Sequence, residues 1–151
     1  MGDNYCLSVG CIVRKQDKVL LVRHTYGGAN GKLLIPGGYC NAGELPEEAA
    51  CREVMEETGI TATVKGVLGI RCHRNNWYML FVMDYMDGEP HSDHKENSEA
   101  FFMDVEEAFG NDDVTHMTKV ALRALQDKKD RLLYPDLEYK KMRGSDYELY
   151  I

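Results

Sequence analysis

Hydrophobic residues in the first third of the chain fall into short runs that are typical of β-strands. Residues 5–14 and 18–25 are rich in β-formers, and the polar pair between them predicts a tight turn. The glycines of residues 26–32 indicate a loop. A short buried strand is then expected over residues 33–35, ended by Pro36-Gly37-Gly38. We therefore expect a strand hairpin, a loop and a third strand.

The next segment, residues 46–58, carries the spacing of an amphipathic helix. Pro46 suits its first turn, and Gly59 stands where a C-terminal cap is expected. Small side chains repeat on one side of it at an i, i+4, i+8 spacing: Ala50, Val54 and Thr58. That side is expected to face the core.

The second half of the chain returns to strand-like patterns and then to another helix. Strands are expected over residues 60–72, 76–86 and 99–105, with a polar loop over residues 87–98. A second helix is expected over residues 114–128. The residues expected on its apolar side are Val120, Ala121, Ala124 and Leu125.

The order of strands, helix, strands and helix predicts an α/β sandwich, in which a mixed sheet lies between helices. With 151 residues, no repeat and no low-complexity linker, the chain fits a single domain, residues 1–151. The tail over residues 130–151 is mixed in composition. Its last five residues alternate in polarity, so they could extend a sheet edge or contact a partner.

Net charge and the length of apolar runs restrict the partners. The formal net charge is −7, which argues against a nucleic-acid duplex because phosphate backbones select basic surfaces. A nucleotide-type small molecule is compatible with this charge, since one or two cations and a metal can hold it. No run approaches the roughly 18 apolar residues of a membrane span, so no membrane partner is expected.

The cysteines are odd in number and scattered: Cys6, Cys11, Cys40, Cys51 and Cys72. Without a C-x-x-C pair they argue against both a disulfide framework and zinc, and the first residues lack the features of a signal peptide. We therefore expect a reduced, cytoplasmic protein. His91 and His94 are a weak metal signal, whose plainer interpretation is a solvated loop.

Acidic residues concentrate between Gly38 and Ile60. The acids are Glu44, Glu47, Glu48, Glu53, Glu56 and Glu57. Arg52 is the one base among these six acids, so the segment carries −5 of the formal −7. Residues three and four apart share a helix face, so the last three acids are expected to lie together.

This acidic face has two interpretations. Exposed to water, like charges at this spacing cost only about 0.2–0.5 kcal/mol per pair, so a solvated surface is acceptable. Alternatively, the glycines on both sides of the helix can fix several carboxylate oxygens as a cage for a hard divalent cation. Mg²⁺ and Mn²⁺ prefer such oxygen ligands.

Residues 38–60 read GYCNAGELPEEAACREVMEETGI. This segment resembles the Nudix box, G-x5-E-x7-R-E-U-x-E-E-x-G-U, where U is aliphatic. Every specified position matches, with Val54 and Ile60 at the aliphatic sites. The resemblance to the Nudix hydrolase family (MutT-like) extends over residues 5 to about 128, and it implies an α/β/α sandwich with a mixed β-sheet between helices.

The resemblance also implies roles for the matching residues. The implied ligands of Mg²⁺ or Mn²⁺ are one backbone carbonyl and three carboxylates: Gly38, Glu53, Glu56 and Glu57. Arg52 resembles the family's arginine that orients Glu53. Glu44 resembles the acid that compensates the charge of this arginine. Alternatively, Arg52 forms a plain surface ion pair, which would contribute little.

The general base is left open by the sequence. Glu53 can serve, and family members often draw one more acid from the loop before a late strand. Glu96 and Glu99 both stand in that region. Glu99 fits the spacing to the following aromatics better, whereas Glu96 could reach into the site from the loop. Either could instead be a solvated loop acid.

Substrate contacts are indicated only by residue type. Arg23, Lys32 and Arg71 are candidates to hold a phosphate, as is Arg74. The aromatic candidates for stacking on a base are Tyr26, Tyr39, Trp77 and Tyr78. An aromatic residue in a strand can instead pack in the core.

The resemblance implies a metal-dependent hydrolase that cleaves a pyrophosphate bond in a nucleoside diphosphate derivative by attack of water on phosphorus. The substrate could be a nucleotide, a nucleotide sugar, ADP-ribose or a dinucleoside polyphosphate. Alternatives on the same fold are a non-catalytic ligand-binding module and an activity like that of isopentenyl-diphosphate isomerase. The alternating C-terminal residues are compatible with a homodimer.

Overall fold

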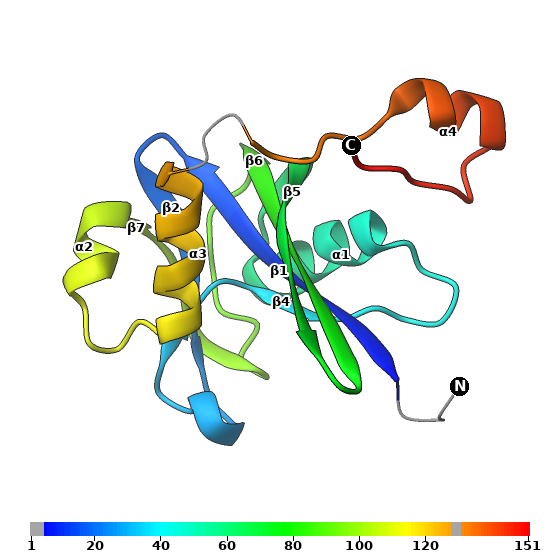
Figure 1. Ribbon diagram of the computed structural model, residues 1–151. Coiled ribbons are helices and arrows are strands. Elements are labelled where there is room, and N and C mark those ends of the chain that lie inside the picture. Colours follow the sequence, from blue (N-terminus) through cyan, green and yellow to red (C-terminus); the bar gives the residue numbers. More distant parts are fainter. Residues whose placement is uncertain (1–4, 128–130) are drawn as a thin grey trace.

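The chain forms one mixed β-sheet with helices on both faces, as a computed structural model describing residues 5–127 and 131–151 shows (Figure 1). The strands are β1 (Cys6–Lys15), β2 (Lys18–His24), β3 (Leu33–Leu34), β4 (Gly37–Tyr39), β5 (Thr61–His73), β6 (Asn76–Asp87) and β7 (Asn97–Asp104). Their order is β3-β2-β1-β6-β5, with β4 paired to β1 and β7 to β2. Only β1 and β6 pair in parallel among these strands. The predicted mixed sheet is confirmed.

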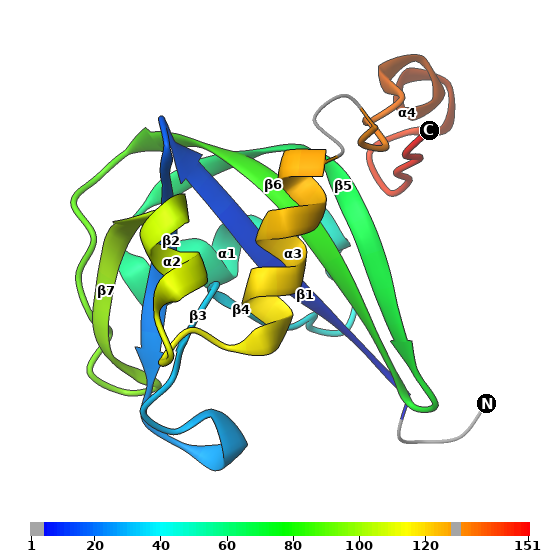
Figure 2. The ribbon, with the colours of Figure 1, turned by 60° about the vertical axis from the view of Figure 1, so that its left-hand side comes forward.

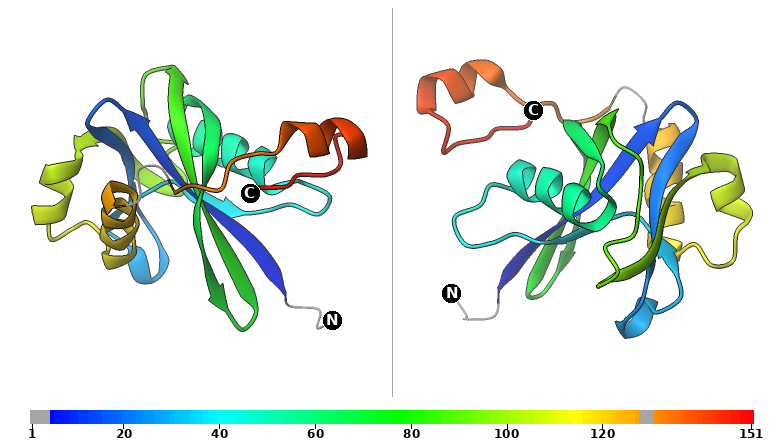
Figure 3. Two further views of the ribbon diagram at one scale, coloured as in Figure 1. Left: turned by 45° about the horizontal axis from the view of Figure 1, so that its top comes forward. Right: turned by 180° about the vertical axis from the view of Figure 1, so that it is seen from behind.

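Helices α1 (Pro46–Thr58), α2 (Val105–Gly110) and α3 (His116–Asp127) make the outer layers of the sandwich. The 3-10 turn η1 (Gly27–Ala29) and α4 (Leu137–Arg143) have no buried residues and lie outside these layers (Figure 1). Figures 2 and 3 show α1 on one face of the sheet and α2 with α3 on the other. Within the part of the chain that the structure describes, no helix has the length and apolarity to cross a membrane. The predicted α/β/α sandwich is confirmed.

Two apolar cores fill the space between the sheet and its helices. Side chains alternate along β1, so that Val9 and Cys11 pack toward α1 whereas Ile12 packs toward α3. A central strand covered on both faces has to be apolar on both. This explains why the first strand lacks the polar alternation of a surface strand.

Helix α1 begins and ends where the sequence predicts. Pro46 occupies its first position, and the Glu48 carboxylate accepts a hydrogen bond of 2.9 Å from the Leu45 N–H. At the other end Gly59 has a φ of 73° and donates to the Met55 carbonyl at 2.9 Å. The predicted inner residues are fully buried: Ala50, Val54 and Thr58.

The glycines after β3 begin a further strand. β3 ends at Leu34, before Pro36, close to the predicted stop, but Gly37–Tyr39 then form β4, antiparallel to β1, which the sequence did not predict. Glycine is a poor strand former, which is why the run indicated a break. Here the Gly37 backbone approaches the Val9 carbonyl so closely that a Cβ would overlap it. Close backbone approach is therefore what these glycines provide.

The second predicted helix, residues 114–128, begins at His116, and Ala121 and Leu125 of its predicted apolar side are buried. Its buried residues are Thr118, Ala121, Leu122 and Leu125. Val120, expected on that side, is 44% exposed, so this part of the prediction is wrong. Helices α2 and α4 were not predicted. Residues 1–4 and 128–130 lie outside the described residues, and the predicted end of this helix at residue 128 falls among them.

The C-terminal tail pairs both with β5 and with itself. Leu133 forms an isolated antiparallel bridge with Val67 of β5, and Pro135 forms another with Tyr150. The Tyr150 hydroxyl donates to the Glu47 carboxylate at 3.0 Å. The alternating end of the chain thus reaches a sheet edge through the preceding tail segment, and it contacts the first turn of α1.

Gly59→Ala is expected to lower the free energy of unfolding by about 1–3 kcal/mol, because alanine is strained at this positive φ. A Cβ at this position would also overlap the His91 ring. Urea denaturation at 25 °C measures the change. The matched control is Gly28→Ala, where a Cβ meets no atom within 4 Å, and its effect is expected to stay within about 0.5 kcal/mol. Equal losses in the two variants would contradict this account.

Candidate active site

Two carboxylates on α1 are buried against β4. Glu53 is 9% exposed and Glu57 is 2% exposed, and they lie four residues apart on one helix face. The Gly37 N–H donates to Glu57 Oε1 at 3.3 Å. Gly38 leaves room for the Glu53 carboxylate, which a Cβ there would overlap. Glu57 Oε2 is buried without a hydrogen-bond partner among the residues that the structure describes.

Arg52 joins the acids of this segment through all of its nitrogens. Its Nε and Nη2 donate to the two oxygens of Glu44 at 2.7 and 2.9 Å, which is a bidentate pair. Its Nη1 donates to Glu53 Oε1 at 2.9 Å and to Glu56 Oε2 at 3.1 Å. Nη2 also donates to the Tyr39 carbonyl at 3.0 Å. The guanidinium therefore fixes the loop before α1 to the helix.

Burial and neighbouring charges shift the pKa values of these acids in opposite directions. Burial, together with the nearby Glu53 charge, raises the pKa of Glu57 to about 9. Burial also raises the pKa of Glu53, although its hydrogen bond from Arg52 opposes the change. The hydrogen bonds from Arg52 hold the pKa of Glu44 below its usual value. Arg52 thus compensates Glu44 and part of Glu53, whereas Glu57 is left without a cation.

A cleft of about 1080 Å³ opens over these carboxylates. Its lining comprises Tyr26, Tyr39, Asn41, Arg52, Glu53, Glu56, Glu57 and residues 91–96. We call residues 91–97, which end at the start of β7, the capping loop. Glu96 of this loop is close enough for its charge to raise the pKa values of Glu53 and Glu57. The structure therefore brings Glu96 to the predicted box acids.

The structure does not bring Glu99 to the cleft lining. Glu99 on β7 lies opposite Arg23 on β2 and forms an ion pair with it. Arg23 also donates to Asp113 at 3.0 Å and to the Gly31 carbonyl at 2.9 Å. The charges of Arg23 and Glu99 therefore compensate one another on the β2–β7 strand pair, outside the cleft lining. Sequence spacing could not show this, because the pairing depends on the β2–β7 register.

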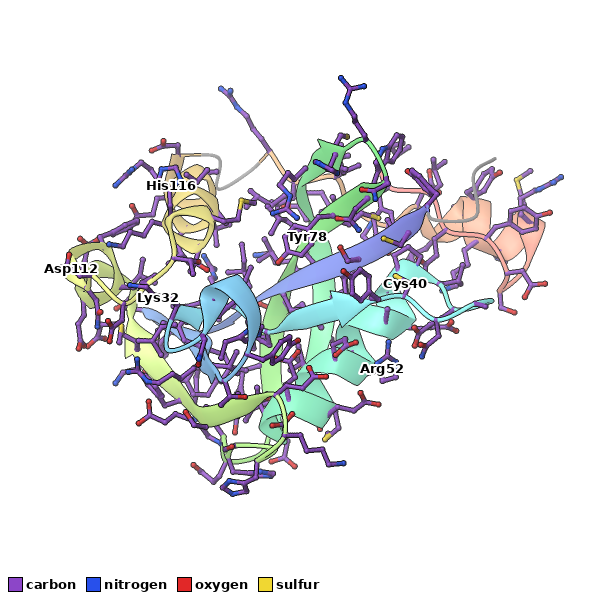
Figure 4. The ribbon with its side chains drawn as sticks, turned by 90° about the horizontal axis from the view of Figure 1, so that it is seen from below. Lys32, Cys40, Arg52, Tyr78, Asp112 and His116 are labelled. Carbon is purple, nitrogen blue, oxygen red and sulfur yellow. The ribbon has the colours of Figure 1, made fainter. Side chains whose placement is uncertain are left out.

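The other cationic candidates also lie outside the cleft lining. Lys32 Nζ donates to the Asp112 carbonyl at 3.4 Å, and Figure 4 shows this pair well apart from Arg52. The Arg71 guanidinium lies over the Tyr78 ring, 4.6 Å from its centroid. Tyr78 packs against the core on the α3 side, as the core-packing alternative predicted.

The sequence predicted that Glu96 could reach into the site from the polar loop over residues 87–98, but it did not single out Asn97. In the structure Asn97 is 1% exposed and donates from Nδ2 to the Glu57 carbonyl at 2.9 Å. Only the packing of the loop against α1 reveals this residue.

The chemistry of the site fits a hard divalent cation. The acids that α1 presents to the cleft offer carboxylate oxygens, and Glu57 Oε2 is an uncompensated one. Two histidines of the capping loop also line the cleft: His91 and His94. No three His, Cys, Asp or Glu side chains within the described ranges converge in a ligand arrangement. The ion pairs explain this, because Arg52 draws Glu53 and Glu56 toward itself. Release of one of these ion pairs would free oxygens for a metal.

The fold and the site together indicate the class of protein. The fold is an α/β/α sandwich, and the site is the acidic helix α1, which follows the glycine-containing strand β4. The profile of the NUDIX domain matches residues 4–125, which include all seven strands and α1. The chain therefore belongs to the Nudix family, as residues 38–60 predicted.

Curated relatives carry hydrolase names. The ADP-ribose pyrophosphatase of Methanocaldococcus jannaschii is 35% identical over 89 residues, which are 55% of this chain and 53% of the relative. The NAD-capped RNA hydrolase NudC of Vibrio cholerae is 35% identical over 96 residues, 62% of this chain and 35% of the relative. The chain thus spans about half or less of the length of these relatives.

Solved structures share the fold. A NUDIX hydrolase from Nitrosomonas europaea superposes with a TM-score of 0.76 at 24% identity, over 85% of this chain and 74% of that chain. A MutT NUDIX hydrolase from Burkholderia pseudomallei gives 0.68 at 22% identity, over 82% and 99%. At this identity the likeness concerns the fold alone.

Glu57→Gln is expected to stabilise the metal-free protein at alkaline pH. The unfolded acid ionises near 4.5 and the folded one near 9, so the folded state binds the extra proton between these values. Stability is therefore full below pH 4.5 and falls as pH rises toward 9. Glutamine stays neutral, so the variant should gain on the order of 5 kcal/mol over wild type at pH 8, because about 1.4 kcal/mol is lost for each pH unit above 4.5.

Urea denaturation in a chelator at pH 5, 7 and 8 measures this gain. The matched control is Glu107→Gln on α2, an exposed acid on the opposite side of the sheet, which should show no such pH-dependent difference. A Glu57→Gln variant that is less stable than wild type at pH 8 would refute the burial of an uncompensated charge.

Proposed function

We propose that this Nudix protein is a divalent-metal-dependent hydrolase that cleaves a pyrophosphate bond in a nucleoside diphosphate derivative. The observation that carries the proposal is the buried Glu57, whose Oε2 has no partner in the described part of the chain and lies beside Glu53 under the cleft. A buried, uncompensated carboxylate is unfavourable unless a bound ligand compensates its charge. A divalent cation is the ligand whose charge would compensate it.

The proposed metal ligands are oxygens of α1 and β4. Glu53, Glu56 and Glu57 would hold Mg²⁺ or Mn²⁺, together with the Gly38 carbonyl. When bound, the metal neutralises charge on the pyrophosphate and lowers the pKa of a bound water. Arg52 orients Glu53 through its Nη1 bond, and the bidentate pair with Glu44 keeps Arg52 in place.

Glu96 is the proposed general base, in preference to Glu99. It lines the cleft opposite the α1 acids, whereas Glu99 is engaged by Arg23. A carboxylate can accept the proton of the attacking water if it lies within hydrogen-bond reach of that water. Glu53 stays an alternative base, although its hydrogen bond from Arg52 lowers its basicity.

The nucleoside is proposed to bind at the aromatic side of the cleft. Tyr26 and Tyr39 line the cleft with their rings largely exposed, and the His24 ring stacks on Tyr26 at 5.0 Å. Exposed aromatic rings beside a phosphate site can stack on a base. The names of the relatives support this class, since ADP-ribose and an NAD cap both contain a nucleoside diphosphate.

Purified protein is expected to release phosphate-containing products from one class of substrate only when Mg²⁺ or Mn²⁺ is present. The panel comprises nucleoside triphosphates, ADP-ribose, NADH, nucleotide sugars and diadenosine polyphosphates. Glu57→Gln should lower kcat by about 10²- to 10⁴-fold, because it removes a carboxylate that acts on the metal and water. Product analysis by chromatography measures both effects.

Glu107→Gln makes the same chemical change on an exposed part of α2 and should retain wild-type kcat. Absence of turnover with every substrate, together with no binding of Mn²⁺ by calorimetry, would sink the hydrolase proposal. It would favour the non-catalytic ligand-binding alternative.

Glu96→Gln is expected to lower kcat by about 10²-fold or more, because it removes the proposed base. Glu99→Gln should change kcat less than about threefold, since this side chain pairs with Arg23 outside the cleft lining. Steady-state kinetics of the two variants decide between the acids. The reverse order would assign the base to Glu99.

A further inference from the structure

The capping loop closes the C-terminal end of the catalytic helix. The last carbonyls of any α-helix have no partner within the helix. At the end of α1, the Glu57 carbonyl accepts from Asn97 Nδ2 at 2.9 Å, and the Thr58 carbonyl accepts from the His91 N–H at 2.9 Å. Both ends of the capping loop are thus joined to the turn that carries Glu57.

Asn97 also organises the loop itself. Its Oδ1 accepts from the Asp93 N–H at 3.3 Å, and its carbonyl accepts from the Ser92 hydroxyl at 2.7 Å. The Asp93 carboxylate accepts from three successive backbone N–H groups at 2.8–3.1 Å: Lys95, Glu96 and Asn97. A single buried side chain therefore links the loop's turn to α1.

Glu96 is held directly next to this link. Its carbonyl accepts from the Thr25 N–H at 3.1 Å and from the Thr25 hydroxyl at 3.0 Å, at the end of β2. The backbone of Glu96 is consequently fixed between β2 on one side and Asn97 on the other. Only its side chain is free to extend into the cleft.

We infer that Asn97 is a positioning residue, which sets the distance between the Glu96 carboxylate and the α1 acids by bonding the Glu57 carbonyl. The inference rests on the proposed function, because it gives Glu96 a role in the reaction. A buried asparagine could serve stability alone. The two roles differ in one respect: a positioning residue acts through Glu96, and a merely stabilising one does not.

The test is a double-mutant cycle of Asn97→Ala and Glu96→Gln. Asn97→Ala is expected to lower kcat by about 10- to 100-fold, because small misplacements of a catalytic group are costly, and to change KM less than about twofold. In the Glu96→Gln background the same substitution should lower kcat less than about threefold. Asn97→Asp keeps the shape and loses the Nδ2 donor, so it should match Asn97→Ala.

Leu125→Ala on α3 is the control for lost stability, since it removes buried apolar contacts in the other core. Measured well below its melting temperature, it should retain wild-type kcat. Hydrogen–deuterium exchange of the metal-free proteins gives a second readout. Exchange in residues 91–96 should rise at least about tenfold in Asn97→Ala and stay unchanged in Leu125→Ala.

The outcomes separate the inference from the proposed function. Additive effects of the two substitutions on kcat, a wild-type kcat in Asn97→Asp, or unchanged exchange in residues 91–96 would each overturn the positioning role. A wild-type protein without metal-dependent turnover would overturn the proposed function, and with it the role of Asn97 in the reaction. The exchange measurement would still decide whether Asn97 joins the loop to the helix.

Discussion

Two carboxylates one helical turn apart, both withdrawn from water, are the constraint on which the rest of the site depends. Burial of an ionised acid is costly without a partner, and a second acid beside it adds repulsion. Arg52 compensates Glu53, whereas Glu57 receives only the Gly37 N–H among the residues that the structure describes. The metal-free site is therefore electrostatically unfavourable at neutral pH. The surrounding fold has to supply the stability that the site does not.

That stability comes from the sheet beneath the helix. β1 is apolar on both faces, and β4 brings two glycines between β1 and α1. The two glycines act differently: Gly37 approaches Val9 and offers its N–H to Glu57, while Gly38 makes room for the Glu53 carboxylate. A side chain at Gly37 would push β4 away from β1, and one at Gly38 would displace the Glu53 carboxylate. The close fit of backbone and carboxylates thus explains the spacing of the motif.

Most of the fold and the centre of the site could be predicted from the sequence, because both depend on local patterns. The apolar side of α1, its Gly59 cap and the central strands follow from periodicity. β4 was missed because glycine has a low propensity for strands, whereas the close approach of the β1 backbone requires glycine at this position. Glu99 and Asn97 could not be assigned, since the β2–β7 register and the packing of the capping loop decide what they contact. Such long-range contacts leave no trace in the spacing of one chain.

The hydrogen bonds of Arg52 have a consequence for how such a protein can change over evolution. A guanidinium has five N–H donors, and here its contacts are two with Glu44 and one each with Glu53, Glu56 and the Tyr39 carbonyl. Its donor capacity is spent inside the protein. Substitutions on the surrounding loops can then accumulate without disturbing this internal network. The frame that holds the acids and the loops around it can therefore diversify independently.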